Sequence, residues 1–268
     1  MAYRPKIGLT MRLEIETRRF YLGRDYSEAV EAAGGMPVHI PLIPDKEFIA
    51  AVVSDLDGIL LPGCDSDVDP SFYGEDRHPK LGRVVPEKDE TDLMVLAEVE
   101  RLDIPLLAIC YGIQVLNVSR GGSLIQDIEA EVESCVKHQQ GQPLARHSHA
   151  ITVEADSLLS QLVDRANLEG RVKVNSHHHQ AIRKTGDDLR SIAWANDGVV
   201  EGIQDVRDDR FVLGVQWHPE LSWKTETLSR AIFEVFISRC REAGEHRRDL
   251  ATTAHHGELS PVGKGRSN

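Results

Sequence analysis

The chain has 268 residues, of which 41% are hydrophobic and 28% are charged, a balance typical of a globular protein with a sizeable core. Its formal net charge of −12 argues against nucleic acid or an anionic membrane as a partner, because both are bound by clustered Lys and Arg. No stretch reaches the ~18 consecutive apolar residues of a membrane helix, and the N-terminus lacks the apolar segment of a secretory signal. We therefore expect a cytoplasmic protein that acts on a small molecule.

In the first half of the chain, short apolar runs bounded by turn residues alternate with helix-like segments. The predicted strands are Lys6–Thr10, Gly58–Leu61 and Pro105–Ile109, and the predicted helices are Asp25–Ala33, Asp45–Val53 and Glu90–Leu102. This alternation predicts an α/β fold with a doubly wound, mostly parallel sheet. In such sheets, ligands bind at the carboxyl ends of the strands.

The second half of the chain, from about residue 146, has the alternating pattern of hairpins and is expected to be richer in β structure. The predicted strands are His149–Val153, Leu189–Asn196, Val199–Gln204 and Phe211–Trp217. An amphipathic pattern predicts a closing helix over Ser222–Ala243. The polar residues 244–268 are expected to form a disordered tail, which leaves residues 1–243 as a single domain.

Cys110 lies at the junction between a predicted strand and a predicted helix. Gly112 permits a tight turn there, and such a turn exposes a nucleophile to the N–H groups of the helix N-terminus. Taken alone, a cysteine in this position is more often a small buried core residue than a nucleophile. The other cysteines, Cys64, Cys135 and Cys240, lack this setting and are expected to be packed or partly exposed thiols. Their spacing predicts neither a disulfide framework nor a zinc site.

The segment His218-Pro219-Glu220 follows a second apolar strand and supplies an imidazole and a carboxylate. Pro219 restrains His218 to an extended conformation and fixes its own φ, so the side chains of residues 218 and 220 are expected to project toward the same side. A base with its orienting carboxylate is the arrangement required beside a nucleophile. Alone, the tripeptide could also be a strand-end histidine followed by a surface glutamate. Together with Cys110 it predicts a catalytic triad.

These residues resemble the class I glutamine amidotransferase domain, and more closely its stand-alone branch, the γ-glutamyl-γ-aminobutyrate hydrolase-like family (peptidase family C26). The resemblance extends over most of residues 6–240. Besides the two segments above, it is carried by LPGCDSDVDPSFYGE at 61–75, GGSLIQDI at 121–128 and VNSHHHQ at 174–180.

The resemblance implies a flavodoxin-like α/β sandwich with Cys110, His218 and Glu220 as the triad. The backbone N–H groups of Gly63 and Tyr111 are then expected to form the oxyanion hole. No cofactor or metal is needed for this chemistry.

The resemblance also indicates residues that hold the substrate. Gln114, one helical turn after Cys110, is a candidate contact to the α-amino-acid end of the substrate. His178, His179 and Gln180 are candidates for shaping the site or binding the substrate. Each of these side chains could instead stabilise its loop or helix through hydrogen bonds.

The sequence departs from the family pattern in three places. Cys64 replaces the second of two glycines after Leu-Pro, and its Cβ narrows the room beside the substrate. Tyr111 follows the nucleophile where Arg is common. Lys88-Asp89-Glu90 stands near a usual Arg-Asp pair, which puts the substrate contacts of that loop in question.

Two metal sites are suggested by the sequence, and we expect neither. His177, His178 and His179 are consecutive, and residues on an extended chain alternate faces, so the three side chains cannot converge on one ion even with His147 and His149 nearby in sequence. Asp65, Asp67 and Asp69 have the spacing of a calcium loop, but the Gly and the terminal Glu of such a loop are missing.

The sequence therefore predicts hydrolysis of the γ-glutamyl amide bond of a small γ-glutamyl compound, through a thioester on Cys110, with release of glutamate and an amine. The leaving amine, which could be aminobutyrate, another product of polyamine catabolism, a dipeptide or a folate-linked glutamate, is not specified. Two alternatives remain: a glutaminase subunit that supplies ammonia to a separate synthetase, and a non-catalytic γ-glutamyl-ligand-binding module. The sequence also leaves open a homo-oligomer.

Overall fold

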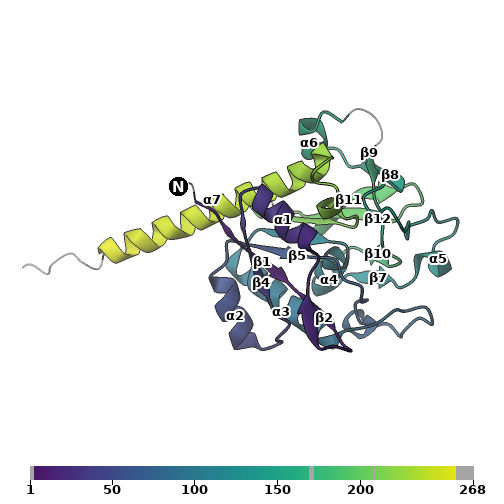
Figure 1. Cartoon of the computed structure of the whole chain (residues 1–268), viewed down its shortest axis with the longest axis horizontal. Coiled ribbons are helices and arrows are strands. Elements are labelled where there is room, and N and C mark those ends of the chain that lie inside the picture. Colours follow the sequence, from purple (N-terminus) through teal and green to yellow (C-terminus); the bar gives the residue numbers. More distant parts are fainter. Residues whose placement is uncertain (1–2, 169–171, 208, 258–268) are drawn as a thin grey trace, which may run out of the picture.

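The computed structural model describes residues 3–168, 172–207 and 209–257, with the side chains of residues 250–257 excepted. Within these residues, nine strands form one sheet in the order β4-β1-β5-β6-β13-β12-β11-β8-β9. Helices cover both faces of the sheet (Figure 1). The predicted class, an α/β fold with a β-rich C-terminal half, is confirmed.

The first part of the sheet is parallel. It consists of β4 (Met36–Ile40), β1 (Lys6–Thr10), β5 (Gly58–Leu61), β6 (Leu106–Ile109) and β13 (Val212–Val215). The residues of β5, β6 and β13 are all buried, because helices cover both sides of these strands, and this burial explains their continuous apolar sequences.

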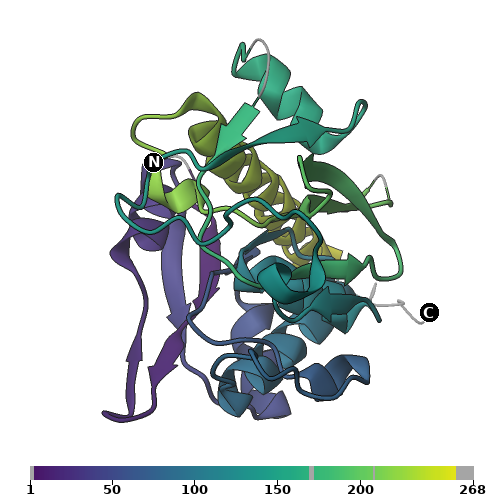
Figure 2. The same cartoon turned by 90° about the vertical axis from the view of Figure 1, so that its right-hand side faces the viewer.

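The second part of the sheet is antiparallel, so the sheet as a whole is mixed. It consists of β12 (Val200–Asp205), β11 (Leu189–Ala195), β8 (His149–Val153) and β9 (Val172–Val174). Two smaller sheets accompany it. One is the hairpin of β2 (Arg12–Glu14) and β3 (Arg19–Tyr21), at the edge of the molecule in Figure 2 (purple, lower left), and the other pairs β7 (Ser123–Ile125) with β10 (Ala181–Lys184).

Each face of the sheet has its own hydrophobic core. One core contains residues of α1 (Arg24–Ala32), α6 (Leu158–Arg165) and α7 (Thr227–Gly257). The other contains residues of α2 (Lys46–Ser54), α3 (Pro86–Leu102) and α4 (Tyr111–Ser119). The short helix α5 (Ile128–Glu131) and the 3₁₀ turns Pro70–Tyr73 and Pro219–Leu221 lie in connecting segments.

The closing helix differs from its predicted bounds, because α7 begins at Thr227 and continues past Ala243 to Gly257 (Figure 1, yellow). The expected disordered tail is therefore wrong for residues 244–257, and its remainder, residues 258–268, lies outside the described residues. The polar extension is anchored to the segment that leads into β5, because Arg247 donates hydrogen bonds to the Leu56 carbonyl at 2.7 Å and to Asp57 at 2.8 Å. Among the described residues, no helix is both long enough and apolar enough to cross a membrane.

Candidate active site

Cys110 occupies a sharp bend between β6 and α4. Its φ of +53° and ψ of −107° lie in a region that non-glycine residues rarely adopt, so the surrounding structure must hold this strained conformation in place. Gly112 makes the bend possible, since a Cβ there would lie 2.3 Å from the Leu61 carbonyl oxygen. As the first residue of α4, Tyr111 has a backbone N–H with no acceptor inside the helix, next to the thiol.

The sheet register brings the carboxyl ends of two strands together at this bend. Ile109 of β6 pairs with Val215 of β13, and the Cys110 N–H donates to the Val215 carbonyl at 2.9 Å. The chain leaving β13 reaches His218 three residues later. The pairing of β6 with β13 is thus the reason that residues 110 and 218, far apart in sequence, lie at one site.

His218 is fixed by contacts to its ring and to its backbone. Its Nδ1 lies 2.6 Å from Oε1 of the buried Glu220. Asn175 accepts a hydrogen bond from the His218 N–H and donates one to the His218 carbonyl, both at 2.8 Å. Glu220 reaches the ring because Pro219 starts a 3₁₀ turn rather than continuing the extended segment that the sequence predicted.

The electrostatics of His218 favour its charged form. Burial alone would lower the pKa of His218, but the negative charges of Glu220 and Cys110, and hydrogen bonds to both side chains, raise it to about 10. The imidazole is thus within hydrogen-bonding reach of the Cys110 sulfur. An imidazolium in this position stabilises a neighbouring thiolate, the nucleophilic form of cysteine.

Gly63, a predicted oxyanion-hole residue, lies at the narrowest point of the site. A Cβ on Gly63 would lie 2.7 Å from Cε1 of His218 and 3.3 Å from Cβ of Cys110. Its N–H donates to the Tyr26 hydroxyl at 3.0 Å, and this hydroxyl also lies 3.5 Å from Nδ1 of His218. If Gly63 stabilises an oxyanion, its N–H must exchange the tyrosine oxygen for the substrate oxygen. Its role stays a prediction.

Tyr111 is the other predicted oxyanion-hole residue, and its side chain is buried against α3. Its hydroxyl donates to Asp89, whose pKa is raised to about 7, above all by burial. Lys88, also fully buried, donates to Asp92 at 2.5 Å and to Thr10 at 2.9 Å. Lys88 and Asp89, which depart from the family pattern, therefore pack beneath the N-terminus of α4.

The site opens into a pocket of about 410 Å³. Most of its lining residues have polar side chains, which suits a small polar substrate. The lining residues are Arg12, Cys64, Asp65, Ser66, Asp67, Gly82, Cys110, Tyr111, Gln114, Gln139, His177, His178, His179, Gln180 and His218.

All four predicted substrate-binding residues line this pocket, and their side chains also bind protein groups. Gln114 donates to the Gln180 carbonyl at 3.1 Å and to the side chain of Gln216 at 3.2 Å. His179 lies 2.9 Å from Asp67, and the hydrogen bond to this carboxylate raises its pKa. These contacts order the lining, and substrate binding by these residues stays a prediction.

The other two predicted residues use different groups. His178 faces the Gln180 carbonyl through Nδ1 at 2.8 Å, and the Gln180 amide donates to the Gln126 carbonyl at 3.2 Å. The Gln180 Oε1 atom is buried without a hydrogen-bond partner among the described residues.

Sequence reasoning did not select Tyr26, Arg12 or Asn175 as site residues. Tyr26 lies in α1 and Arg12 in β2, and Arg12 donates to the Gly63 carbonyl at 2.6 Å. No local motif marks these positions, because their contacts are made only when the sheet forms. Asn175 could have been found, since it belongs to the VNSHHHQ segment at 174–180.

The comparisons with known proteins agree with this fold. A solved structure from Thermoplasma acidophilum, described as one subunit of a putative GMP synthase, superimposes with a TM-score of 0.63 over 92% of this chain and 100% of that structure, at 17% sequence identity. At that identity the match establishes the fold alone. This chain therefore shares the fold of that structure.

The sequence comparisons define the family. The model for Peptidase C26 matches residues 6–220, so the chain belongs to the peptidase C26 family. It is similar to γ-glutamyl-γ-aminobutyrate hydrolase PuuD of Escherichia coli K12, with 34% identity over 82% of this chain and 86% of that protein. It is also similar to protein NtpR of Enterococcus hirae, with 34% identity over 81% of this chain and 88% of that protein. A putative glutamine amidotransferase of Mycobacterium tuberculosis is 33% identical over 87% of this chain and 75% of that protein.

Proposed function

We propose that this protein hydrolyses the γ-glutamyl amide bond of a small γ-glutamyl compound, with Cys110 as nucleophile. The observation that carries the proposal is the strained Cys110 at the N-terminus of α4, within reach of a His218 ring held by Glu220. The similarity to γ-glutamyl-γ-aminobutyrate hydrolase supports this bond type and a γ-aminobutyrate-like leaving group.

In the first step, the Cys110 thiolate attacks the side-chain carbonyl carbon of the substrate. The carbonyl oxygen becomes an oxyanion, which the backbone N–H groups of Tyr111 and Gly63 stabilise. His218 then donates its proton to the leaving nitrogen, the C–N bond breaks, and a γ-glutamyl thioester remains on Cys110. Glu220 stabilises the imidazolium before this transfer.

In the second step, the neutral His218 ring removes a proton from water, and the hydroxide formed attacks the thioester carbonyl. The C–S bond breaks, glutamate leaves and the Cys110 thiolate pairs again with the imidazolium. Arg12 and Asp65 at the pocket wall supply the opposite charges that would bind the α-carboxylate and α-amino groups of the glutamyl part. Gln114, His178, His179 and Gln180 complete this proposed substrate site.

A second candidate function is that of a glutaminase that supplies ammonia to a separate synthetase chain. The names of relatives favour this candidate, since several, including the mycobacterial one, are called putative glutamine amidotransferases. Both functions use the same first step and differ in the leaving group, an amine in one case and ammonia in the other.

A screen of γ-glutamyl amides by mass spectrometry tests the proposal. Purified protein without a partner should release glutamate from γ-glutamyl-γ-aminobutyrate or a related amide. The Cys110→Ala variant should lose this activity by at least about 10⁴-fold. If only glutamine is cleaved, and only when a synthetase is added, the glutaminase function is supported instead.

A further inference from the structure

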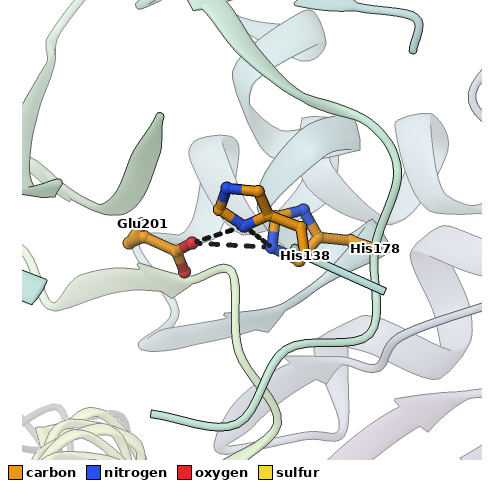
Figure 3. A group of neighbouring side chains, drawn as sticks. All are labelled: His138, His178 and Glu201. Carbon is orange, nitrogen blue, oxygen red and sulfur yellow. Dashed lines mark hydrogen bonds and ion pairs between the residues drawn. The ribbon is translucent and has the colours of Figure 1, made fainter. Parts of the chain in front are cut away.

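We propose that His138, His178 and Glu201 form a binding site for a divalent transition-metal ion, preferentially zinc, in the wall of the active-site pocket. The three residues come from separate parts of the chain: the segment after α5, the β9–β10 connection and strand β12. Figure 3 shows that both imidazoles and the carboxylate point at one another. All three side chains are almost completely buried.

The spacing of the three candidate ligand atoms fits a tetrahedral ion. The distance from Nδ1 of His138 to Nε2 of His178 is 3.2 Å, and Oε1 of Glu201 lies 3.3 Å from the first nitrogen and 3.5 Å from the second. Zinc bonds to nitrogen and oxygen of about 2.0–2.1 Å require tetrahedral ligands to be about 3.3–3.4 Å apart. The triangle of His138, His178 and Glu201 thus has the size of one face of such a tetrahedron.

The second nitrogen of each imidazole is committed to an oxygen that can only accept a hydrogen bond. Nε2 of His138 lies 3.0 Å from the Asp197 carboxylate, and Nδ1 of His178 lies 2.8 Å from the Gln180 carbonyl. Those two nitrogens must carry the protons, so in the neutral rings the facing nitrogens present lone pairs. Carboxylate and carbonyl acceptors behind the rings are also the usual outer partners of metal-bound histidine. Two lone pairs and a carboxylate oxygen repel one another unless a positive charge, either a metal ion or a proton, lies between them.

The local charge also calls for a cation. Glu201 is fully buried, and its Oε1 lies within 3.5 Å of ring nitrogens of His138, His149 and His178. In the described part of the chain, the ion pairs of Glu201 and Asp197 are all with histidines. Oε2 of Glu201 is buried without a hydrogen-bond partner among the described residues. A dication would neutralise both carboxylates while leaving the histidines neutral.

The ligand set and its surroundings indicate the kind of ion and its effect. Two imidazoles and one carboxylate are ligands of zinc and related divalent transition metals, with a water molecule in the fourth position. Nε2 of His149 lies 2.9 Å from Oε1 of Glu201 and supports this oxygen from outside. Because His178 lines the pocket and binds the Gln180 carbonyl, the ion would fix the 177–180 wall of the pocket.

Metal analysis of the protein tests this site, in a Cys110→Ala background so that the active-site thiol cannot bind the ion. The protein should carry a tag without histidines, be loaded with Zn²⁺ and be dialysed against metal-free buffer. We expect about one zinc ion per chain by mass spectrometry, and visible bands of tetrahedral Co²⁺ after exchange. His138→Gln and Glu201→Gln should each abolish both signals, whereas the exposed His39→Gln, which also removes one imidazole, should leave them unchanged.

Circular dichroism establishes whether each variant is folded. The effect of zinc on the Tm of the parent protein is a second result, which does not depend on the folding of the variants. Zinc should raise the Tm of the parent and of His39→Gln, and not that of His138→Gln. Absence of bound zinc, of Co²⁺ bands and of a Tm shift in the parent would overturn the proposal and leave a proton on His138 as the occupant. Zinc retained by both cluster variants would place the ion elsewhere and would also overturn it.

Discussion

The Nδ1 atom of His218 lies 2.6 Å from Oε1 of Glu220, only two residues further along the chain. The 3₁₀ turn that starts at Pro219 makes this contact possible, and two hydrogen bonds from Asn175 hold the backbone of His218 beside it. Nδ1 therefore faces the carboxylate, which leaves Nε2 for the proposed proton transfer with Cys110 and the substrate.

Replacing Glu220 by Gln should lower the pKa of His218 from about 10 toward its ordinary value, because one of the negative charges that raise it is removed. Because the pKa of His218 is raised on folding, protonation of its ring contributes to the free energy of unfolding. This contribution is fully present below pH 6.5 and is lost as the pH rises to about 10. Nitrogen NMR of the His218 ring checks this. At pH 8.5 the ring should be doubly protonated in the parent and mostly neutral in the variant. The proposed role of Glu220 also predicts a loss in kcat of about 10²–10⁴-fold.

Gly63→Ala should strongly reduce turnover, because the new Cβ would meet Cε1 of His218 at 2.7 Å and separate the imidazole from Cys110. We expect a stability loss of about 1–3 kcal/mol from the overpacking. Gly23→Ala is the matched control, since its Cβ would meet only the Tyr26 ring, at 3.8 Å. Steady-state kinetics and urea denaturation measure both variants. Equal turnover in the two variants would show that the close approach at Gly63 is not needed.

Lys88→Met should destabilise the protein by about 3–5 kcal/mol, because it leaves the Asp92 carboxylate buried without its cation. The double variant Lys88→Met/Asp92→Leu should recover much of this loss, since neither charge remains. Urea denaturation at neutral pH measures the free energy of unfolding of each. A double variant as unstable as the single one would mean that packing beneath Tyr111, rather than the charge, determines the cost.

Truncation after Ala243 should lower the Tm relative to truncation after Gly257. The shorter chain loses the hydrogen bonds of Arg247 to Asp57 and to the Leu56 carbonyl, at the end of the helix that crosses the sheet. A loss of about 1–2 kcal/mol is expected from a partly exposed charged pair and its hydrogen bonds. Differential scanning calorimetry compares the two chains. Identical melting curves would show that residues 244–257 do not contribute to the stability of the domain.

The sequence allowed the α/β class and the meeting of Cys110 with His218 to be predicted, because both depend on local signals. Each residue ends an apolar run, and parallel strands bring such ends to one edge of the sheet. The roles assigned to Gly63 and Gln114 depend instead on where their polar groups point. The structure gives each a partner, Tyr26 and Gln216 respectively, that no sequence spacing indicates.

The cluster of His138, His178 and Glu201 could not be predicted for a related reason. Our expectation of no metal weighed only residues close in sequence, and for the histidines it rested on the alternation of faces along an extended chain. The cluster takes just one residue from that run and joins it to two distant segments. The bridge between Gln139 and His177 places His138 beside His178. The α7 extension was missed because its polar sequence resembles a tail. Its anchor, the contact of Arg247 with Asp57, joins residues that are far apart in the sequence.

The most direct measurement of the central proposal is to trap the covalent intermediate. The protein is mixed with a γ-glutamyl amide, quenched in acid within milliseconds to seconds and digested, and the peptides are analysed by mass spectrometry. The proposed mechanism predicts a γ-glutamyl group on the Cys110 peptide, which is absent from the Cys110→Ala variant and from protein denatured before mixing. Release of glutamate by Cys110→Ala at the parent rate would contradict it.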